Sequence, residues 1–375
     1  MQLFVKGLRL KKHSISITLE ALGVNMGVIH PDISKAQTLP SNYYTDEKLY
    51  LQLLEKFPRS WNFIGLESML DEKTIVPVSI GEIPMLLTKQ DSQIHCVSNV
   101  CTHRGMLLCQ ESKSTSSITC PYHGRVFSLD GKMKHMPKFS EVKNFPADTD
   151  NLPNAKVVNW HGLLFANLSS DDLFEEYIES VESRMSFLDF SKLNRDSGLD
   201  RLHELSANWM LYVDNYLEGF HIPYVHKDLN SVIDYSNYET EVFENAVLQI
   251  GYAIDDEECF DIPSNHQDYG KKIAAYYWWI FPNLMLNFYP WGLSINVVLP
   301  QGISLTKIAY YGLILDKSKL GLGAGGDLDT VEDEDQWIVE SCDKGMNSPL
   351  YQRGRYSPSM EQGVHHFHRL LTEQN

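Results

Sequence analysis

The sequence lacks the features that mark several large classes of protein. Its 375 residues carry 32 basic and 49 acidic side chains, a net charge of −17, so there is no excess of positive charge for nucleic acid or for an anionic membrane surface. It has no run of about 18 apolar residues, the length that spans a bilayer. We also expect no dinucleotide-binding fingerprint of the G-x-G-x-x-G type, which leaves any use of NAD(P)H to another chain.

Cysteine is scarce as well. Six cysteines in a chain of this length are too few for the disulfide framework of a small secreted domain. The first 23 residues are basic but have no continuous apolar core and no evident cleavage site, so we expect no signal peptide. The sequence therefore predicts a cytoplasmic protein with reduced thiols, in which Cys96 and Cys109 are buried apolar residues.

The spacing of apolar residues divides the chain. Residues 45–61 have helical periodicity, whereas residues 60–168 form short runs typical of strands, with a hairpin signal at Asp130-Gly131. Residues 171–188 predict an acidic amphipathic helix. A larger mixed segment follows, with a proline-broken helix at 206–226, aromatic strands at 276–300, a flexible linker or loop at 321–329 and helical periodicity near the C-terminus.

Two Cys/His pairs lie on loops of the small β domain. Cys101 and His103 are separated by one residue, and Cys120 and His123 by two. Tetrahedral zinc accepts two cysteines and two histidines, but zinc fingers usually place a Cys pair before a His pair. One Cys and one His from each loop is the arrangement of a Rieske [2Fe–2S] centre, in which two thiolates hold one iron and two imidazoles hold the other. The order of the ligands therefore favours the cluster over structural zinc.

A second group of metal-ligand residues lies in the stretch NWMLYVDNYLEGFHIPYVH, residues 208–226. Glu218 and His221 are three residues apart, which predicts that they share one helix face, and His226 follows the break at Pro223. With one carboxylate from elsewhere, the two histidines make the 2-His-1-carboxylate triad of non-haem Fe(II) oxygenases, which leaves positions open for O2. An acidic run at 332–340 could supply this carboxylate, although such a run is ordinarily the solvated start of a helix. Its candidates are Glu332, Asp333, Glu334 and Asp335.

Together these patterns resemble the α subunits of Rieske non-haem iron oxygenases, over roughly residues 35 to 370. The stretches LPSNYYTD, NYLEGFHIPYVH, WWIFPNLMLNFYPWG and EDEDQWIVESCDKGMNSPLYQRGRYS are similar to the choline, glycine betaine and carnitine monooxygenase branch. The resemblance implies an α+β fold. Its parts would be a small β-rich Rieske [2Fe–2S] domain at 60–168 and a helix-grip catalytic domain with an antiparallel sheet at 169–375, which residues 1–59 join.

The resemblance also implies the metal ligands. The cluster ligands would be Cys101, His103, Cys120 and His123, and the ligands of a mononuclear Fe(II) would be His221, His226 and Asp335, with Asp333 as the fallback. The tract VHHFHRLL near the C-terminus supplies further histidines, which we assign to packing or to the surface: His365, His366 and His368.

Glu218 would take a catalytic role in such an enzyme. It stands where the family has an acid that bridges a Rieske histidine of one subunit to the iron site of its neighbour, which implies at least a ring of subunits and, as the expected state, a homotrimer. Asp214 and Asn208 would support the same helix. Asp343 departs from the family pattern, because the branch normally has glutamine there.

The implied reaction is hydroxylation of a C–H bond by O2, with electrons from NAD(P)H passed on by a separate reductase. A quaternary-ammonium substrate would be held by cation–π attraction to aromatic rings, for which the candidates, most of them expected to pack the core, are Tyr276, Tyr277, Trp278, Trp279, Phe288, Tyr289 and Trp291. Two alternatives stay open. One is an aromatic-ring hydroxylating oxygenase or dioxygenase, and the other is a Rieske electron carrier with a non-catalytic binding domain and no further iron.

Overall fold

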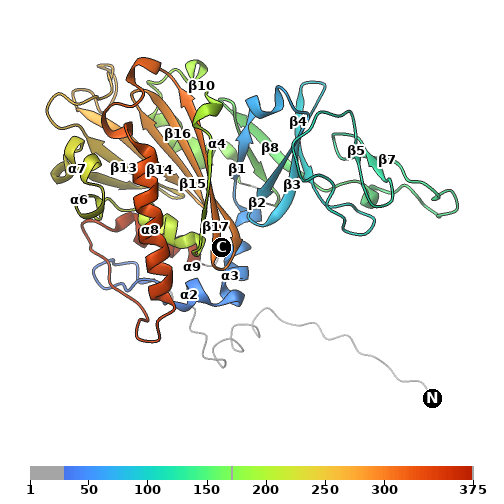
Figure 1. Cartoon of the computed structure of the whole chain (residues 1–375), viewed down its shortest axis with the longest axis horizontal. Coiled ribbons are helices and arrows are strands. Elements are labelled where there is room, and N and C mark those ends of the chain that lie inside the picture. The colour runs from blue at the N-terminus through green and yellow to red at the C-terminus, as the bar shows by residue number, and fades with distance from the viewer. Residues whose placement is uncertain (1–28, 170–171, 374–375) are drawn as a thin grey trace.

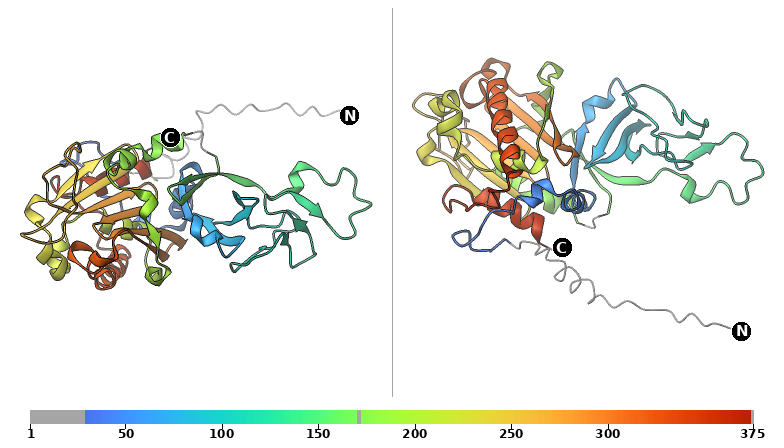
Figure 2. Two further views of the ribbon diagram at one scale, coloured as in Figure 1. Left: turned by 90° about the horizontal axis from the view of Figure 1, so that it is seen from above. Right: turned by 60° about the horizontal axis from the view of Figure 1, so that its bottom comes forward.

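The computed structural model describes residues 29–169 and 172–373. Figure 1 shows two parts side by side, a large sheet with most of the helices around it and a smaller group of strands that projects from one side. Figure 2 shows the same division from two further directions. The predicted α+β fold is confirmed, with antiparallel sheets in both parts. None of the helices in the described ranges is both long enough and apolar enough to cross a bilayer.

The smaller part is built on a six-stranded sheet in the order β1-β9-β8-β4-β3-β2, and a three-stranded sheet, β5-β6-β7, extends beyond it. The predicted turn at Asp130-Gly131 joins β6 to β7, and Gly131 has the positive φ of +84° that favours glycine. The bounds are β1 Asn62–Leu66, β2 Ile75–Ile80, β3 Ile83–Gln90, β4 Gln93–Ser98, β5 Ile118–Thr119, β6 Val126–Phe127, β7 Met133–His135, β8 Asn154–Trp160 and β9 Leu163–Asn167.

The larger part contains an eight-stranded sheet in the order β10-β17-β16-β15-β14-β13-β12, with β11 also paired to β17. The aromatic stretch at 276–300 forms strands here, as predicted, and is buried on both faces: neighbouring Trp278 and Trp279 enter different core clusters. The bounds are β10 Asn194–Arg195, β11 Arg201–Leu205, β12 Glu239–Val242, β13 Ala246–Tyr252, β14 Ile273–Ile280, β15 Leu284–Tyr289, β16 Gly292–Gly302 and β17 Leu305–Ile314.

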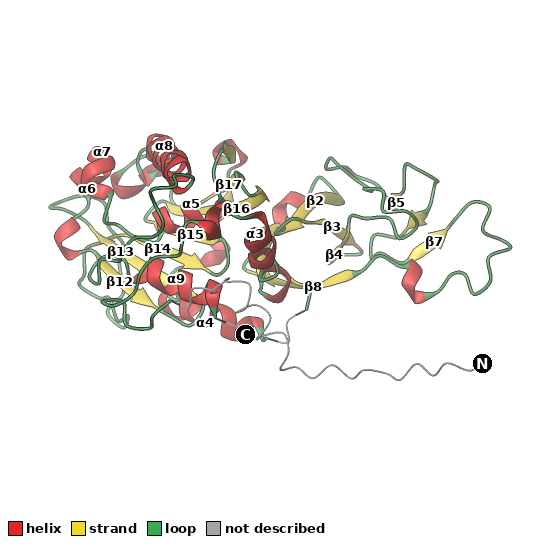
Figure 3. Cartoon of the chain, turned by 90° about the horizontal axis from the view of Figure 1, so that it is seen from below, coloured by secondary structure: helices red, strands yellow, loops and turns green. Residues whose placement is uncertain are grey.

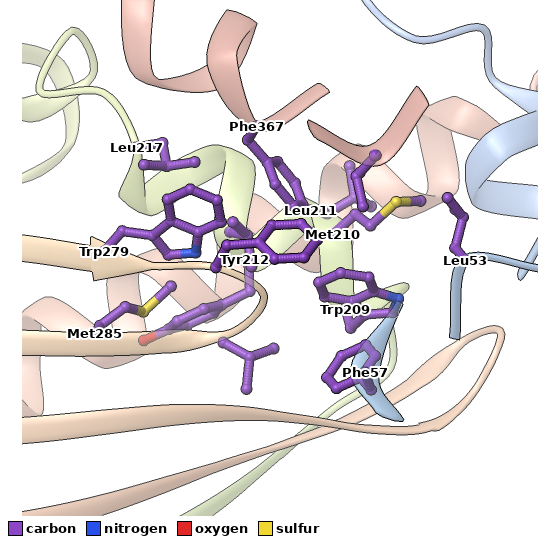
Figure 4. Packing of buried hydrophobic residues seen from close by; sticks show 14 of the residues in the cluster. Leu53, Phe57, Trp209, Met210, Leu211, Tyr212, Leu217, Trp279, Met285 and Phe367 are labelled. Carbon is purple, nitrogen blue, oxygen red and sulfur yellow. The ribbon is translucent and has the colours of Figure 1, made fainter. Parts of the chain in front are cut away.

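Helix α5 lies at the centre of the core that positions the site. It packs against α8, α9 and β16. Figure 4 shows Trp209 of this helix between Phe57 and Phe367, whose rings it meets edge to face at centroid distances of 5.3 and 5.8 Å. The bounds are α2 Asn42–Thr45, α3 Glu47–Leu54, α4 Phe174–Arg184, α5 Trp209–Tyr216, α6 Ile222–Val225, α7 Lys227–Val232, α8 Leu328–Met346 and α9 Gln362–Thr372.

The described part of the N-terminal segment contacts the C-terminal region. The Thr38 N–H donates to the Gly354 carbonyl at 3.2 Å, and Arg353 Nε donates to the Thr38 carbonyl at 2.9 Å. These contacts are those expected if residues 1–59 join the catalytic domain, although the domain boundaries themselves stay a prediction. The basic stretch at the start of the chain lies outside the described residues.

The helix predicted over 206–226 with a break at Pro223 is interrupted earlier, after Tyr216, and Pro223 lies inside the next helical turn. Helix α5 ends at Tyr216, and the chain turns through Gly219 before the single turn of α6 begins after His221. A Cβ on Gly219 would lie 2.7 Å from the Tyr238 ring, so no other residue fits this turn without displacing the ring. Glu218 and His221 therefore meet across a turn, with Glu218 Oε2 accepting from the His221 N–H at 3.0 Å, and not along one helix face.

Candidate active site

Two matched turns carry the Cys/His pairs at the end of the smaller part. They place Cys101 and His103 between β4 and β5, and Cys120 and His123 between β5 and β6. In each turn a glycine four residues after the cysteine donates its N–H to the cysteine carbonyl at 3.0 Å. These glycines, Gly105 and Gly124, have φ values of +70° and +71°. The two turns therefore share one backbone conformation that glycine adopts without strain.

The four side chains fit a two-iron cluster. Cys101 and Cys120 are each 2% exposed, and burial raises the pKa of the Cys101 thiol, with Cys120 adding to the shift. The rings of His103 and His123 meet edge to face with centroids 4.8 Å apart, and the buried His123 Nδ1 has no hydrogen-bond partner among the described residues. Ligands of one tetrahedral zinc lie about 3.5 Å apart. Among the described residues, the group of three metal-ligand side chains whose ligand atoms all lie within 4.8 Å of one another is found in the larger part of the molecule. It contains none of these four residues, which argues against a single zinc ion between them. A sulfur pair and a separate imidazole pair is the Rieske donor set.

Arg125 joins the two turns. It follows the second turn, is 1% exposed, and donates from Nη1 to Thr102 Oγ1 in the first turn at 3.0 Å. It also forms an ion pair with Asp150, whose backbone carbonyl accepts from the Thr102 hydroxyl at 2.7 Å. Because hydrogen bonds from a buried guanidinium are strong, these contacts hold the two Cys/His pairs at a constant spacing. Tyr122 is 57% exposed beside His123, so this edge of the site reaches the surface.

A second ligand group forms where α6 meets α8. The Nε2 atoms of His221 and His226 are 3.1 Å apart, and Asp335 Oδ1 is 3.0 Å from the second and 3.6 Å from the first. Neighbouring ligands of an octahedral ion with bonds of roughly 2.1 Å are separated by about 3 Å. The three side chains therefore fit one face of an octahedral ion and leave the opposite face open. Of the four acids that the sequence left open, Asp335 is the one whose carboxylate reaches the Nε2 atoms of both histidines, and Asp333 is exposed.

Two carboxylates hold the histidines from behind. Glu218 Oε1 is 2.8 Å from His221 Nδ1, and Glu334 Oε2 is 2.7 Å from His226 Nδ1. A carboxylate at Nδ1 keeps the imidazole proton there and turns the Nε2 lone pair toward a metal. Burial lowers the pKa of His226, but the hydrogen bonds and charges of Asp335 and Glu334 outweigh it, so the pKa lies above its ordinary value. The negative charge around the histidines thus favours a cation between them.

Buried polar contacts tie α5 to its neighbours. Asp343 Oδ1 accepts from the Asn208 backbone N–H at 3.0 Å at the start of α5, and burial raises the pKa of this carboxyl. Asp214 Oδ1 lies 2.8 Å from His368 Nε2, and its Oδ2 accepts from the Tyr44 hydroxyl at 2.7 Å. The departure at Asp343 is thus accommodated as a helix contact away from both metal-ligand groups. The two other C-terminal histidines also contact protein groups: His365 Nε2 lies 2.8 Å from the His30 carbonyl, and His366 Nε2 lies 3.1 Å from the Glu244 carbonyl.

The triad opens into a cavity of about 280 Å³. Three of the candidate aromatic residues line it, Tyr277, Tyr289 and Trp291, and the rings of the last two stack with centroids 5.5 Å apart. The expectation that most candidates pack the core is confirmed for the other four: Tyr276, Trp278, Trp279 and Phe288. Further tyrosines that the sequence did not single out also line the cavity: Tyr216, Tyr238 and Tyr310.

The glycine-rich segment at 321–329 is a wall of this cavity and not a linker. It contains a short 3-10 helix, Gly323–Gly325, and a Cβ on Gly325 would lie 2.3 Å from Trp291 Nε1. The residues GLGAGG here do have the spacing G-x-G-x-x-G, so the expectation that this pattern is missing is wrong. The segment is still no dinucleotide fingerprint, because the strand before it, β17, runs antiparallel to its neighbours and opens no parallel βαβ unit.

The sequence did not assign two further side chains near the triad. Asn215 Nδ2 donates to Asp335 Oδ1 at 2.7 Å, and Glu332 lines the cavity. A signal for Glu332 was present, because residues three apart on a helix share a face and Asp335 is three residues on. Asn215 contacts a residue 120 positions away, and nothing local in the sequence indicates that contact.

The fold and these two ligand groups define a two-part redox protein, with a Rieske-type loop pair and a separate mononuclear metal centre. Residues 60–146 match the Rieske [2Fe-2S] domain, and residues 192–374 match the ring hydroxylating alpha subunit, catalytic domain. The chain belongs to the family of Rieske non-haem iron oxygenase α subunits, as its sequence predicted. It is therefore an oxidoreductase whose cofactors are a [2Fe–2S] Rieske cluster and a mononuclear iron.

The chain is similar to oxygenases of the quaternary-ammonium branch. Choline monooxygenase of Beta vulgaris is 30% identical over 357 residues, which cover 90% of this chain and 77% of that protein. The carnitine monooxygenase oxygenase subunit of Escherichia coli K12 is 29% identical over 365 residues, which cover 90% and 94%.

Solved structures share the fold. A quaternary ammonium Rieske monooxygenase has a TM-score of 0.75 at 24% identity, with 92% of this chain and 96% of that one covered. Naphthalene 1,2-dioxygenase from Rhodococcus has a TM-score of 0.68 at 19% identity, with 89% and 93% covered. At these identities the fold is what is shared, so they do not decide between the two substrate classes.

Proposed function

We propose that this chain is the terminal oxygenase component of a multi-component system and hydroxylates a C–H bond of a quaternary-ammonium substrate. The observation that carries the proposal is the opening of the triad of His221, His226 and Asp335 into a cavity lined by tyrosine and tryptophan rings. Aromatic faces attract quaternary ammonium groups through cation–π interaction. The choline and carnitine monooxygenases among the relatives support the same substrate class.

In this proposal the cluster ligands are Cys101, His103, Cys120 and His123, and the iron ligands are His221, His226 and Asp335. When bound, the cluster supplies single electrons and the mononuclear iron supplies the activation of O2. The protein's own groups provide the geometry. Glu218 and Glu334 orient the imidazoles, Asn215 holds the Asp335 carboxylate, and the cavity wall separates the substrate from bulk water.

The proposed electron path runs between subunits of a homotrimer. In one chain the turns around β5 and the ligands around α6 lie at opposite ends of the molecule in the views of Figures 1 and 3, so a path within one chain would cross its whole length. Inter-subunit electron transfer is described for the solved quaternary ammonium monooxygenase. We include in the proposal a separate NAD(P)H-dependent reductase, Glu218 as the bridging acid and a cytoplasmic location.

Substitution of the bridging acid tests this path. Glu218→Gln should leave the cluster and iron contents unchanged but slow the reoxidation of the reduced cluster by O2 and substrate roughly 10- to 100-fold. The amide can still accept a hydrogen bond from His221 but carries no charge. Stopped-flow absorbance of the cluster measures the rate. Asp228→Asn removes an exposed acid from the neighbouring helix α7 and should react at the wild-type rate. Wild-type kinetics in Glu218→Gln would remove Glu218 from the path.

A substrate screen tests the proposed reaction. With a surrogate reductase and NADH, the purified chain should consume O2 in a substrate-coupled manner with choline, glycine betaine, L-carnitine or γ-butyrobetaine, and not with naphthalene. Uptake coupled only to arenes would support the ring-hydroxylating alternative. Absence of coupled uptake with any compound, together with iron for the cluster alone, would support the electron carrier.

A further inference from the structure

Glu332 is a carboxylate in the cavity wall that neither metal-ligand group uses. It lies on α8 three residues before Asp335, one helical turn away, and is one of the residues that line the cavity. Its side chain is half-buried. The surface that it keeps is therefore available to a molecule bound beside the triad.

Three uncharged donors hold this carboxylate in place. Oε2 accepts from the hydroxyls of Tyr212 at 2.6 Å and Tyr310 at 2.5 Å, and Oε1 accepts from Asn296 Nδ2 at 3.2 Å. These bonds stabilise the ionised form. Burial and the nearby charge of Asp335 oppose them and raise the pKa of Glu332 to about 7. A positive charge placed beside Glu332 would therefore shift it firmly to the ionised state.

No described lysine or arginine that lines the cavity is paired with Glu332. Among the described residues that line the cavity, Arg201 is the one lysine or arginine, and this side chain is exposed and lies 3.8 Å from Asp329. No ion pair to Glu332 is formed by a described residue: its contacts are the two phenols and the amide. A carboxylate removed from bulk water without an opposite charge is costly, and a cationic ligand would remove that cost.

We propose that Glu332 is the counter-charge that selects a permanently cationic head group, and hence that it determines specificity in this site. The inference rests on the proposed function and names the residue that recognises the substrate class. A quaternary ammonium group has no N–H to donate, so charge and aromatic faces recognise it. Both elements are present in this cavity. Glu332, which accepts from the Tyr310 hydroxyl, supplies the charge, and the stacked rings of Tyr289 and Trp291 supply the aromatic surface.

Calorimetric titration of the purified full-length chain with tetramethylammonium, and separately with tert-butanol as a neutral molecule of similar size, tests this role. The wild-type chain should bind tetramethylammonium more tightly than tert-butanol. Glu332→Gln should weaken tetramethylammonium binding about tenfold or more and leave tert-butanol binding unchanged, because the amide keeps the shape and loses the charge. Glu332→Asp should recover part of the preference. Asp333→Asn removes an exposed acid from the next position of the helix and should change neither affinity.

Three results would overturn the inference: no binding of tetramethylammonium by the wild-type chain, an unchanged preference in Glu332→Gln, or an equal loss for both ligands, which indicates a structural role. Failure of the proposed function is distinguishable from these. Amine-coupled O2 uptake with an unchanged preference in Glu332→Gln defeats only the role of Glu332. A charge preference that depends on Glu332, without amine turnover, defeats only the proposed reaction.

Discussion

Replacement of His226 by alanine should lower the iron content from about three atoms per chain to about two and abolish substrate-coupled O2 uptake. His226 is 2% exposed, and both of its ring nitrogens are engaged, Nε2 near Asp335 and Nδ1 with Glu334. Its removal leaves two of the three ligands, and it takes away the imidazole that lies between the half-buried carboxylates of Glu334 and Asp335. Activity should fall by at least about a thousandfold, because the chemistry needs the third ligand. Iron analysis, cluster absorbance and O2 uptake measure the three quantities.

His203→Ala is the matched control. His203 also lines the cavity and packs against Tyr310 with ring centroids 5.2 Å apart, but it belongs to neither ligand group. The variant should keep about three irons and the cluster absorbance. Three irons and undiminished turnover in His226→Ala would contradict the assignment of the triad. An iron content of two in the wild-type chain would contradict the oxygenase itself.

The fold was predictable where a pattern is local. Strand alternation and the Asp130-Gly131 turn located the smaller part, and the aromatic stretch at 276–300 located the strands that are buried on both faces. The break after Tyr216 was not predictable, because the close approach of Gly219 to Tyr238 depends on how two distant segments pack. The same applies to the glycine-rich segment at 321–329, whose closeness to Trp291 makes it a wall of the cavity.

The candidate site divides in the same way. Short spacings in the sequence brought out the two Cys/His pairs and the pair of His221 and His226, because ligands on one turn are local. The choice of Asp335 among four neighbouring acids needed either a resemblance to a known family or the structure. Which of the four reaches the Nε2 atoms of both histidines depends on how α8 is rotated against α5. The aromatic candidates show the limit of composition, since three of the seven line the cavity, two of them (Tyr289 and Trp291) from within a buried cluster, and the other four pack the core away from it.

Replacement of Cys120 by serine should remove the cluster, with loss of its visible absorption and of about two irons per chain. Cys120 is 2% exposed in the core of the smaller part, and its N–H donates to the Arg125 carbonyl at 2.7 Å, so the turn itself should persist in the variant. A serine hydroxyl is a much poorer ligand for an iron–sulfur cluster than a thiolate. Electrons from the reductase would then have no acceptor, and substrate-coupled O2 uptake should stop. Absorption spectroscopy, iron analysis and circular dichroism separate loss of the cluster from loss of the fold.

Cys109→Ser provides the control within the same core cluster. Cys109 is 5% exposed, packs with Cys101 and Cys120, and donates from its thiol to the Glu111 carbonyl at 3.0 Å. A serine can make the same bond, so this variant should keep the cluster and lose about 1 kcal/mol of stability. Loss of the absorption in Cys109→Ser but not in Cys120→Ser would contradict the ligand assignment. Cys120→Ser should leave one iron per chain and no cluster absorption, whereas His226→Ala should leave two irons and the full cluster absorption. The two variants therefore identify the two metal centres independently of each other.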